Sequence, residues 1–362
     1  MGLEVNIKKK LKNFTLKIQF ETELGIRGIL GASGCGKSMT LKAIAGLVTP
    51  DEGRIVLNGK VLFDSKQKIN LPPQKRKVGY LFQNYALFPN MTVEENIMVG
   101  LLGNKREKAK KVSEMIQLFN LHGLEKQYPN RLSGGQQQRV AFARLLAYDP
   151  EVMLLDEPFS ALDSCLKEQL QVQIKEILKR YKKTVLMVSH DRMEIYRLCD
   201  EIMTMKNGVV LQKGTTKEVF DAPREPITAR LMGYRNLSTV RWINEQKLEA
   251  VDWNVQIEDM NKQDRPLVAI HERNLVLKER QEGEKNHFPV QIINIFEDLY
   301  EYQILVDLNQ KVSKKEDFSY LWTIVRKGAE WDGMEEGTKA WVYIPEDKLI
   351  FLEDSRNDEK RG

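Results

Sequence analysis

The sequence predicts an α/β domain that is followed by a smaller all-β domain. Val152 to Leu155 and Thr184 to Val188 are continuous apolar runs, which are typical of strands buried on both faces of a parallel sheet. Helical patterns lie between the strands, as in the spacing of Leu166, Leu170 and Ile174. From about residue 237 onward the chain holds short β-rich pieces and no long helical period. Alternating strands and helices favour an α/β fold, and the later pieces favour a separate β domain.

Length and composition limit the class of protein. The chain has 362 residues, of which 42% are apolar and 30% charged, and this fits about two globular domains. Its 56 Lys and Arg against 51 Asp and Glu leave a net charge of +5, so we expect no nucleic-acid partner. The apolar runs fall far short of the roughly 20 residues that span a bilayer. With no apolar stretch of the signal-peptide kind and only three cysteines, we expect a cytoplasmic protein without a disulfide framework or a zinc site.

The first 30 residues are predicted to form strands. Apolar residues there alternate with polar ones, as expected of half-buried strands, at positions Phe14, Leu16, Ile18 and Phe20. Two Asn-Gly pairs, Asn58-Gly59 and Asn207-Gly208, lie between β-rich runs. Each pair predicts a two-residue hairpin turn.

Helices are predicted between the later strands. Apolar residues recur at helical spacing at Ala109, Val112, Ile116 and Phe119. The charged runs Lys105 to Lys111 and Lys179 to Lys183 are interpreted as solvated helix faces.

The C-terminal part is predicted to be a small barrel or sandwich of about 120 residues. A strict alternation indicates one of its strands, at Tyr300, Tyr302, Ile304 and Val306. The final residues, Glu353 to Gly362, are polar, and we expect them to fray.

A glycine-rich loop forms the first candidate site. Gly31-Ala32-Ser33-Gly34-Cys35-Gly36-Lys37-Ser38 fits G-x-x-x-x-G-K-[ST], after an apolar strand and before a helical run. In such a loop, backbone N–H groups and a helix N-terminus face phosphates. We expect this segment and Met39 to bind ATP, with Lys37 on the β- and γ-phosphates and Ser38 on Mg²⁺. The alternative, a chance glycine-rich turn, does not explain the strand and helix on either side.

Two carboxylates form the second candidate site. The apolar run Val152 to Leu155 leads directly into Asp156 and Glu157. At the end of a buried strand, Asp156 can reach a Mg²⁺ ion and Glu157 can polarise a water for attack on the γ-phosphate. The alternative is that both are structural carboxylates. One further expectation concerns Cys35, whose position at a helix N-terminus should lower the pKa of its thiol.

A third motif carries a resemblance to a known family. Leu132-Ser133-Gly134-Gly135-Gln136 heads a helical pattern, which makes a second N-terminus able to bind anions. With the glycine-rich loop, Asp156-Glu157, Ser160 to Asp163, Gln83 and His190, it resembles the ATP-binding-cassette (ABC) ATPases in motif and order. The resemblance covers roughly residues 1–233 and implies an ABC nucleotide-binding domain with a helical subdomain at about residues 88–147.

The resemblance implies a shared site in a homodimer. In the family two cassettes pack head to tail, so Lys37 and Ser38 act within one subunit and the signature, Leu132 to Gln136, acts on the ATP of the other. Gln83 is similar to the glutamine that senses Mg²⁺ and the attacking water. His190 is similar to the histidine that contacts the γ-phosphate, and Asp163 to the residue that communicates across the dimer.

The same resemblance implies membrane partners. It predicts an ATPase coupled to transport, a peripheral protein on the cytoplasmic face of the membrane, which drives two permease subunits and serves an extracytoplasmic substrate-binding protein indirectly. The segment Gln83 to Asn90 matches the one that receives permease helices. Tyr85, Leu87 and Phe88 are expected to form its apolar docking surface, unless they pack inside the helical subdomain.

The separate cassette with an appended β domain resembles importers. Residues 234–355 are expected to form a regulatory or dimerisation domain similar to the oligonucleotide/oligosaccharide-binding (OB, or TOBE-like) barrels of such importers, and 356–362 a flexible tail. The stretch Leu71 to Pro89 is similar to molybdate-importer ATPases, so molybdate or tungstate is the expected solute. Sulfate, iron, polyamine and sugar remain alternatives.

The other class considered is a soluble ABC ATPase that acts outside transport, in DNA repair, chromosome structure or translation. Chromosome-type members carry large insertions between the phosphate loop and the signature, and translation-type members carry two cassettes, whereas this chain has neither.

Overall fold

The computed structural model describes residues 2–160, 162, 164–259, 262–279, 285–308, 320–328 and 334–353, without the side chains of residues 164 and 165. The chain divides into two compact units, Met1–Lys217 and Glu218–Gly362. The division precedes the expected domain boundary at residue 233, because the two short helices after residue 215 fall largely in the second unit. Each unit is described by itself.

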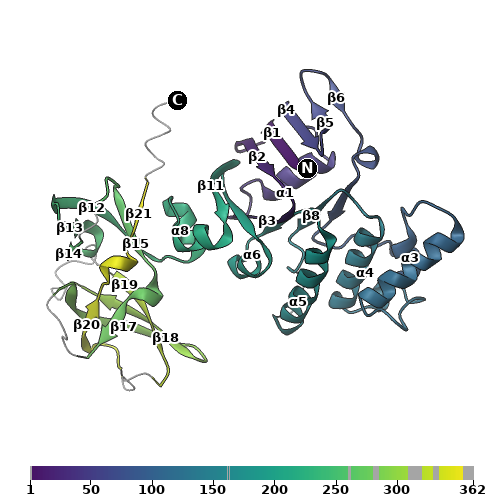
Figure 1. Ribbon diagram of the computed structural model, residues 1–362. Coiled ribbons are helices and arrows are strands. Elements are labelled where there is room, and N and C mark those ends of the chain that lie inside the picture. Colours follow the sequence, from purple (N-terminus) through teal and green to yellow (C-terminus); the bar gives the residue numbers. More distant parts are fainter. Residues whose placement is uncertain are drawn as a thin grey trace. The chain divides into compact units, whose positions relative to one another are not determined.

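The described part of the first unit contains one sheet of eleven strands (Figure 1). Its order is β6-β5-β4-β1-β2-β11-β10-β3-β9-β8-β7. The strands are β1 (Leu3–Lys10), β2 (Thr15–Thr22), β3 (Gly25–Gly31), β4 (Glu52–Leu57), β5 (Lys60–Asp64), β6 (Ile69–Asn70), β7 (Val78–Leu81), β8 (Val152–Asp156), β9 (Thr184–Ser189), β10 (Glu201–Lys206) and β11 (Val209–Thr215).

The antiparallel half of this sheet confirms the alternation predicted from the sequence. Leu16, Ile18 and Phe20 of β2 are buried, whereas the residues between them are exposed. Both Asn-Gly turns are also confirmed, because they join β4 to β5 and β10 to β11 with positive φ at both turn residues. That geometry matches the twist of the strands on either side.

The parallel half places the candidate site. Strands β10, β3, β9, β8 and β7 run parallel, and every residue of β8 and β9 is buried. In the register, Leu30 pairs with Ser189 and Asp156 with Val188. The residues that follow these strands therefore meet at one edge of the sheet, which is where ligands bind in such folds.

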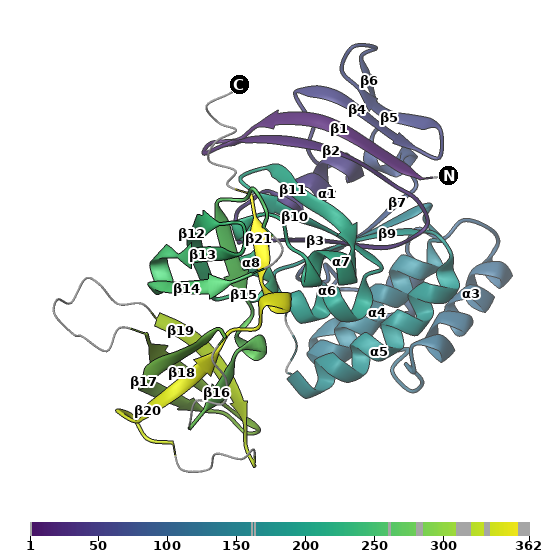
Figure 2. The same ribbon diagram turned by 60° about the vertical axis from the view of Figure 1, so that its left-hand side comes forward.

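Helices cover the sheet and form a separate group. They are α1 (Lys37–Ala45), α2 (Val93–Met98), α3 (Lys105–Leu118), α4 (Gly134–Ala147), α5 (Ser164–Tyr181) and α6 (Arg192–Leu198). Helices α2, α3 and α4 pack together within the span expected for a helical subdomain, and α5 lies beside α4 (Figure 2). Capping boxes at Thr92–Glu95 and Asn104–Glu107 begin α2 and α3, since they satisfy the free N–H groups of the first turn.

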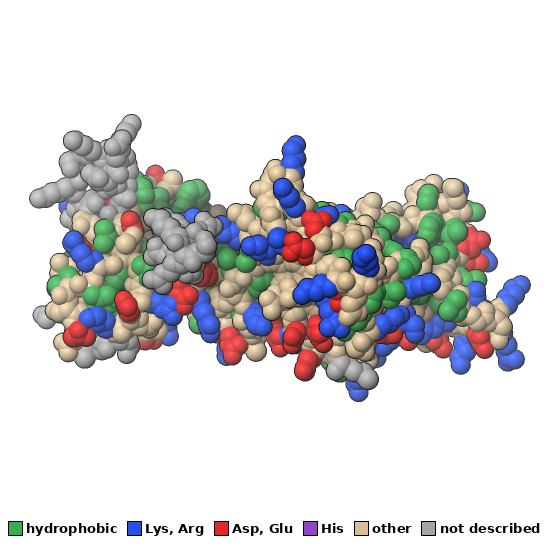
Figure 3. Space-filling model, turned by 90° about the horizontal axis from the view of Figure 1, so that it is seen from above, with side chains coloured by type: hydrophobic (Ala, Val, Ile, Leu, Met, Phe, Trp, Pro, Cys, Tyr) green, Lys and Arg blue, Asp and Glu red, His purple; other side chains and the backbone are tan. Residues whose placement is uncertain are grey.

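Among the described residues, no helix is long and apolar enough to cross a membrane. Acidic and basic side chains are interspersed over the face shown in Figure 3.

Arg76 anchors the helix that follows the phosphate loop. Arg76 is 1% exposed, and its guanidinium donates to the backbone oxygens of Ala43 and Ile44, both at 2.9 Å, near the end of α1. It also donates to Leu71 O and Asn70 Oδ1, both at 2.8 Å. Burial lowers the pKa of Arg76 to about 10, so the group stays charged at neutral pH.

We expect Arg76→Met to lower the free energy of unfolding by about 3 kcal/mol, because it leaves buried carbonyl oxygens without a donor. Urea denaturation of the full chain measures this. The exposed neighbour Lys75 gives the control, since Lys75→Met should stay within about 0.5 kcal/mol of the parent. Equal stability of the two variants would contradict the anchoring role.

The second unit is rich in strands, as predicted. Its described residues form two antiparallel five-stranded sheets, ordered β14-β13-β12-β15-β21 and β16-β20-β17-β18-β19. Its elements, with α7 at the junction of the units, are α7 (Thr216–Asp221), α8 (Pro226–Met232), β12 (Asn236–Asn244), β13 (Lys247–Ala250), β14 (Val255–Glu258), β15 (Leu267–Ile270), β16 (Val276–Lys278), β17 (His287–Glu297), β18 (Glu301–Asp307), β19 (Tyr320–Arg326), β20 (Lys339–Tyr343) and β21 (Ile350–Leu352).

Both sheets of the second unit contribute to one core. Ile257 and Val268 of the first sheet pack in the same buried cluster as Ile304 and Val342 of the second. Tyr300 lies just before β18 and is 82% exposed, so the predicted alternation begins at Tyr302. The barrel type stays a prediction, and the tail 356–362 lies outside the described residues.

Candidate nucleotide-hydrolysis site

The phosphate loop joins β3 to α1. Gly31 ends β3, the loop covers Ala32 to Gly36, and α1 begins at Lys37. Gly36 caps the helix with φ of 108°, and a Cβ there would lie 2.8 Å from Leu16 Cδ1. A side chain at this position is therefore excluded both by backbone conformation and by space.

The ammonium of Lys37 lies inside the loop. It is 5% exposed and donates to Gly31 O at 2.8 Å and Ala32 O at 3.1 Å. These two carbonyl oxygens hold the lysine across the mouth of the loop, where a phosphate oxygen can replace them as its acceptor. Met39, in the same first turn, packs on the buried cluster of the first unit, which includes Cys35 of the loop.

Ser38 and Asp156 are joined directly. Ser38 Oγ donates to Asp156 Oδ1 at 2.7 Å, and Tyr80 OH donates to Asp156 Oδ2 at 2.7 Å. Burial raises the pKa of Tyr80, as does its bond to Asp156, so the phenol remains a donor. A hydroxyl beside a carboxylate oxygen is the hard-oxygen pair that Mg²⁺ prefers, so these residues fit the expected metal.

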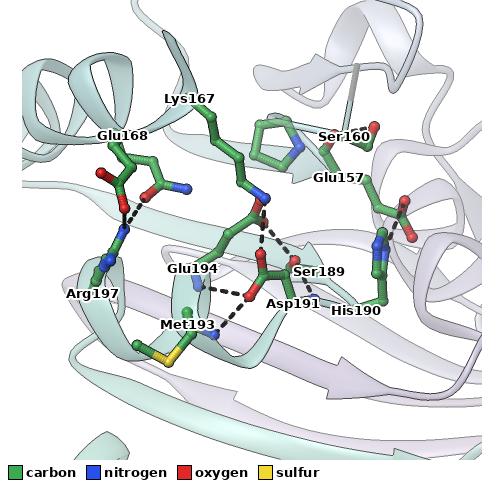
Figure 4. Close-up of polar contacts among 12 residues, drawn as sticks. Glu157, Ser160, Lys167, Glu168, Ser189, His190, Asp191, Met193, Glu194 and Arg197 are labelled. Carbon is green, nitrogen blue, oxygen red and sulfur yellow. Dashed lines mark hydrogen bonds and ion pairs between the residues drawn. The ribbon is translucent and has the colours of Figure 1, made fainter. Parts of the chain in front are cut away.

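Glu157 lies between two other predicted residues. Gln83 Nε2 donates to Glu157 Oε2 at 3.1 Å. His190 Nδ1 lies 3.2 Å from the same oxygen, and Figure 4 shows this contact. The backbone of Glu157 has φ of 46°, which is uncommon for a residue with a side chain, and its N–H donates to Val188 O at 3.0 Å. The turn after β8 thus directs this carboxylate toward the residues that follow β7 and β9.

The signature forms the start of a different helix. Ser133 caps α4, since its hydroxyl accepts from the Gln136 N–H at 3.3 Å while its own N–H donates to Gln136 Oε1 at 2.9 Å. Leu132 is buried, and a Cβ on Gly135 would lie 2.4 Å from Leu166 Cδ2 of α5. Gly134 begins the helix. Asp163 lies outside the described residues, so the structure does not place it.

Two expectations are corrected by burial. The pKa of the Cys35 thiol is raised, not lowered, because the thiol is 5% exposed and loses hydration, and this outweighs the attraction of Lys37. Tyr85 is 4% exposed and packs inside, so it cannot dock a partner, whereas Phe88 is 43% exposed. Arg144 fixes this segment by donating to the backbone oxygens of Tyr85 and Ala86, both at 2.8 Å.

Two residues that contact the site were missed in the sequence. Tyr80 belongs to β7, the strand that pairs in parallel with β8. A prediction of that pairing would have placed Tyr80 near Asp156. Lys167 contacts the segment after β9, and only its place in a predicted helix could be read from the sequence. Neither residue belongs to a motif that the sequence displays.

The geometry agrees with the comparisons to known proteins. The family model "ABC transporter" matches residues 11–160. The sulfate/thiosulfate import ATP-binding protein of Mesostigma viride is 41% identical over 64% of this chain, which spans 66% of that relative. The spermidine/putrescine import ATP-binding protein of Clostridioides difficile is 38% identical over 75% of this chain and 78% of the relative. The Fe(3+) ions import ATP-binding protein of Brucella abortus is 40% identical over 68% of this chain and 70% of the relative.

This chain belongs to the ABC transporter family. It is an ATPase coupled to transport, and the resemblance inferred from the signature is confirmed. A solved dimeric ATP-binding cassette in a post-hydrolysis state with ADP and Pi aligns with a TM-score of 0.50 at 29% identity, over 60% of this chain and 99% of that one. The family match at residues 11–160 lies within the first unit.

Proposed function

We propose that the chain is the ATP-hydrolysing subunit of an importer and acts as a homodimer with composite sites. The observation that carries the proposal is the position of the Glu157 carboxylate, between Gln83 and His190, at the sheet edge that also holds Ser38 and Asp156. At this edge the residues of the phosphate loop bind phosphates, and Glu157, directly after β8, activates water.

Each residue has a defined part in the proposed reaction. Lys37 exchanges the carbonyl oxygens of Gly31 and Ala32 for oxygens of the β- and γ-phosphates. Ser38 and Asp156, with Gln83, would hold Mg²⁺, which supplies positive charge to the phosphates. Glu157 accepts the proton of the attacking water, and His190 faces the γ-phosphate from beside it. The signature of the second subunit closes the site, and Asp163 connects the two sites.

The dimer drives two permease subunits from the cytoplasmic face of the membrane in this proposal. ATP holds the cassettes together, and hydrolysis separates them, because the products ADP and phosphate together carry more negative charge than ATP. The exposed ring of Phe88 and the half-buried Leu87 supply the docking surface for the permease. For the second unit we propose a regulatory or dimerisation role of the OB/TOBE kind, which its two sheets around one core support.

We further propose that the solute is a tetrahedral oxyanion. Molybdate and tungstate, predicted from the sequence, share this shape and charge with the sulfate named for a relative at 41% identity. The alternatives are polyamines and iron, which are named for the two other relatives, and sugar. A soluble ABC ATPase without a transport role has no support in these names.

The complete importer, purified with its permease and binding protein and reconstituted in vesicles, tests the solute. We expect molybdate, tungstate or sulfate to raise its ATPase rate several-fold, whereas Fe³⁺, spermidine and maltose leave the rate unchanged. Stimulation by iron, spermidine or the sugar alone would overturn the oxyanion proposal and leave the ATPase assignment intact.

A further inference from the structure

The turn that carries His190 is held on both sides of the histidine. Ser189 Oγ donates to Glu194 Oε2 at 2.6 Å and accepts from the Asp191 N–H at 2.9 Å. Asp191 Oδ1 in turn accepts from the N–H groups of Met193 at 2.8 Å and Glu194 at 3.4 Å, so it caps α6. The neighbours of His190 on either side are therefore part of one hydrogen-bonded network.

Lys167 joins this network from another element. Its ammonium lies 2.8 Å from Asp191 Oδ2 and 2.6 Å from Glu194 Oε1. Lys167 belongs to the first turn of α5, which begins at Ser164. Figure 4 shows its side chain reaching across to the two carboxylates, on the far side of the turn from the contact between His190 and Glu157.

The charges explain why a lysine is needed there. The Glu194 side chain is only 4% exposed, and a buried carboxylate without a cation is strongly destabilised. Burial by itself would lower the pKa of Lys167, but its hydrogen bonds to Asp191 and Glu194 outweigh burial and raise it. The pKa of Asp191 is lowered because bonds from Lys167 and the α6 backbone outweigh its own desolvation. Lys167 and Asp191 thus remain charged, and the ammonium lies within hydrogen-bond distance of both carboxylates.

We propose that Lys167 is a positioning residue for hydrolysis, which fixes the turn from Ser189 to Asp191 and thereby holds the ring of His190 against Glu157. The inference rests on the proposed role of His190 in hydrolysis. It extends that role to α5, which follows the segment of Ser160 to Asp163. Ser160 Oγ donates to Glu157 O at 3.0 Å. Helix α5, which begins at Ser164, is bonded through Lys167 to the turn of His190.

The test uses steady-state ATPase kinetics of the full-length chain. We expect Lys167→Met to lower kcat about 10- to 100-fold, because displacement of a catalytic group by about 1 Å has an effect of this size. KM for ATP should change less than about two-fold, since Lys167 does not contact the phosphate loop. Lys167→Arg keeps the cation and should restore most of kcat.

A neighbouring ion pair provides the matched control. Arg197 Nη1 lies 2.9 Å from Glu168 Oε1 and also joins α6 to α5, but it does not reach the turn of His190. Arg197→Met should keep the parental kcat. If it lowered kcat as much as Lys167→Met, general loosening of the two helices would explain the result and the positioning role would be overturned.

A double-mutant cycle separates positioning from a loss of folding. In the His190→Ala background, Lys167→Met should cause no further loss of kcat, because the residue it positions is absent. If Lys167→Met folds poorly, Lys167→Met with Glu194→Gln removes the unpaired buried charge, and this pair should regain stability while kcat stays low. If the losses of kcat from Lys167→Met and His190→Ala were additive, the inference would be overturned. It would also be overturned if the variant with both Lys167→Met and Glu194→Gln were stable and kept the parental kcat. Parental activity of His190→Ala itself would instead overturn the proposed function.

Discussion

Replacing Glu157 by glutamine is expected to lower the ATPase kcat by about 10²- to 10⁴-fold, the range found for the loss of a general base. The amide has nearly the same shape, but it cannot accept the proton of the attacking water. Gln83 and His190 both face Glu157 Oε2, so the loss of charge falls at the centre of the site. In the proposed function ATP binding depends on Lys37 and the loop, so we expect it to remain.

Because binding remains and hydrolysis stops, Glu157→Gln should accumulate as an ATP-bound dimer. Light scattering after gel filtration with ATP and Mg²⁺ measures this, and stopped ATPase assays measure the rate. Glu176→Gln is the control, since that carboxylate of α5 is 59% exposed and pairs with Lys179, and it should behave as the parent does. Parental turnover of Glu157→Gln would remove Glu157 from the chemistry.

The second large effect is expected from mixing two inactive variants. Lys37→Ala should weaken ATP binding about 10- to 100-fold, since a charge-assisted hydrogen bond contributes about 1.5–3 kcal/mol. Ser133→Arg places a bulky cation on the cap of α4, where in the proposed dimer the signature of one subunit closes the site of the other. Each variant alone should show almost no ATPase activity, because every dimer has two defective sites.

A mixed dimer has one intact site in the composite arrangement. The phosphate loop of the Ser133→Arg subunit faces the signature of the Lys37→Ala subunit, and both of these are unaltered. The mixture should therefore recover activity, up to roughly a quarter of the parental rate for random pairing of two-fold dimers. Circular dichroism of each variant controls for folding. No recovery from two folded variants would contradict sites shared across the dimer.

The phosphate loop and the carboxylates show what local sequence can predict. The loop of Gly31 to Ser38 is one continuous segment, and its conformation follows from its own glycines, the strand before it and the helix after it. Asp156 and Glu157 follow an apolar run that is typical of a buried strand. The carboxyl ends of parallel strands lie together. The sequence therefore also implies that the loop and the carboxylates meet at one edge of the sheet.

Other contacts of the site depend on packing between distant segments. The raised pKa of Cys35 and the burial of Tyr85 follow from neighbours in the fold. The sequence displayed only a helix N-terminus and an aromatic residue in a segment expected to dock a partner. Local rules predicted the opposite direction for the thiol, because they include the helix but omit desolvation.

The sequence by itself determined the cassette, the residues of the phosphate loop and the carboxylates after β8, since each belongs to a pattern that a short window contains. Only the tertiary structure decided that Tyr80 donates to Asp156 and that Lys167 bonds to Asp191 and Glu194. The reason is that a hydrogen bond requires two atoms within about 3 Å. Strand register and helix packing set that distance, and the spacing of residues along the chain does not.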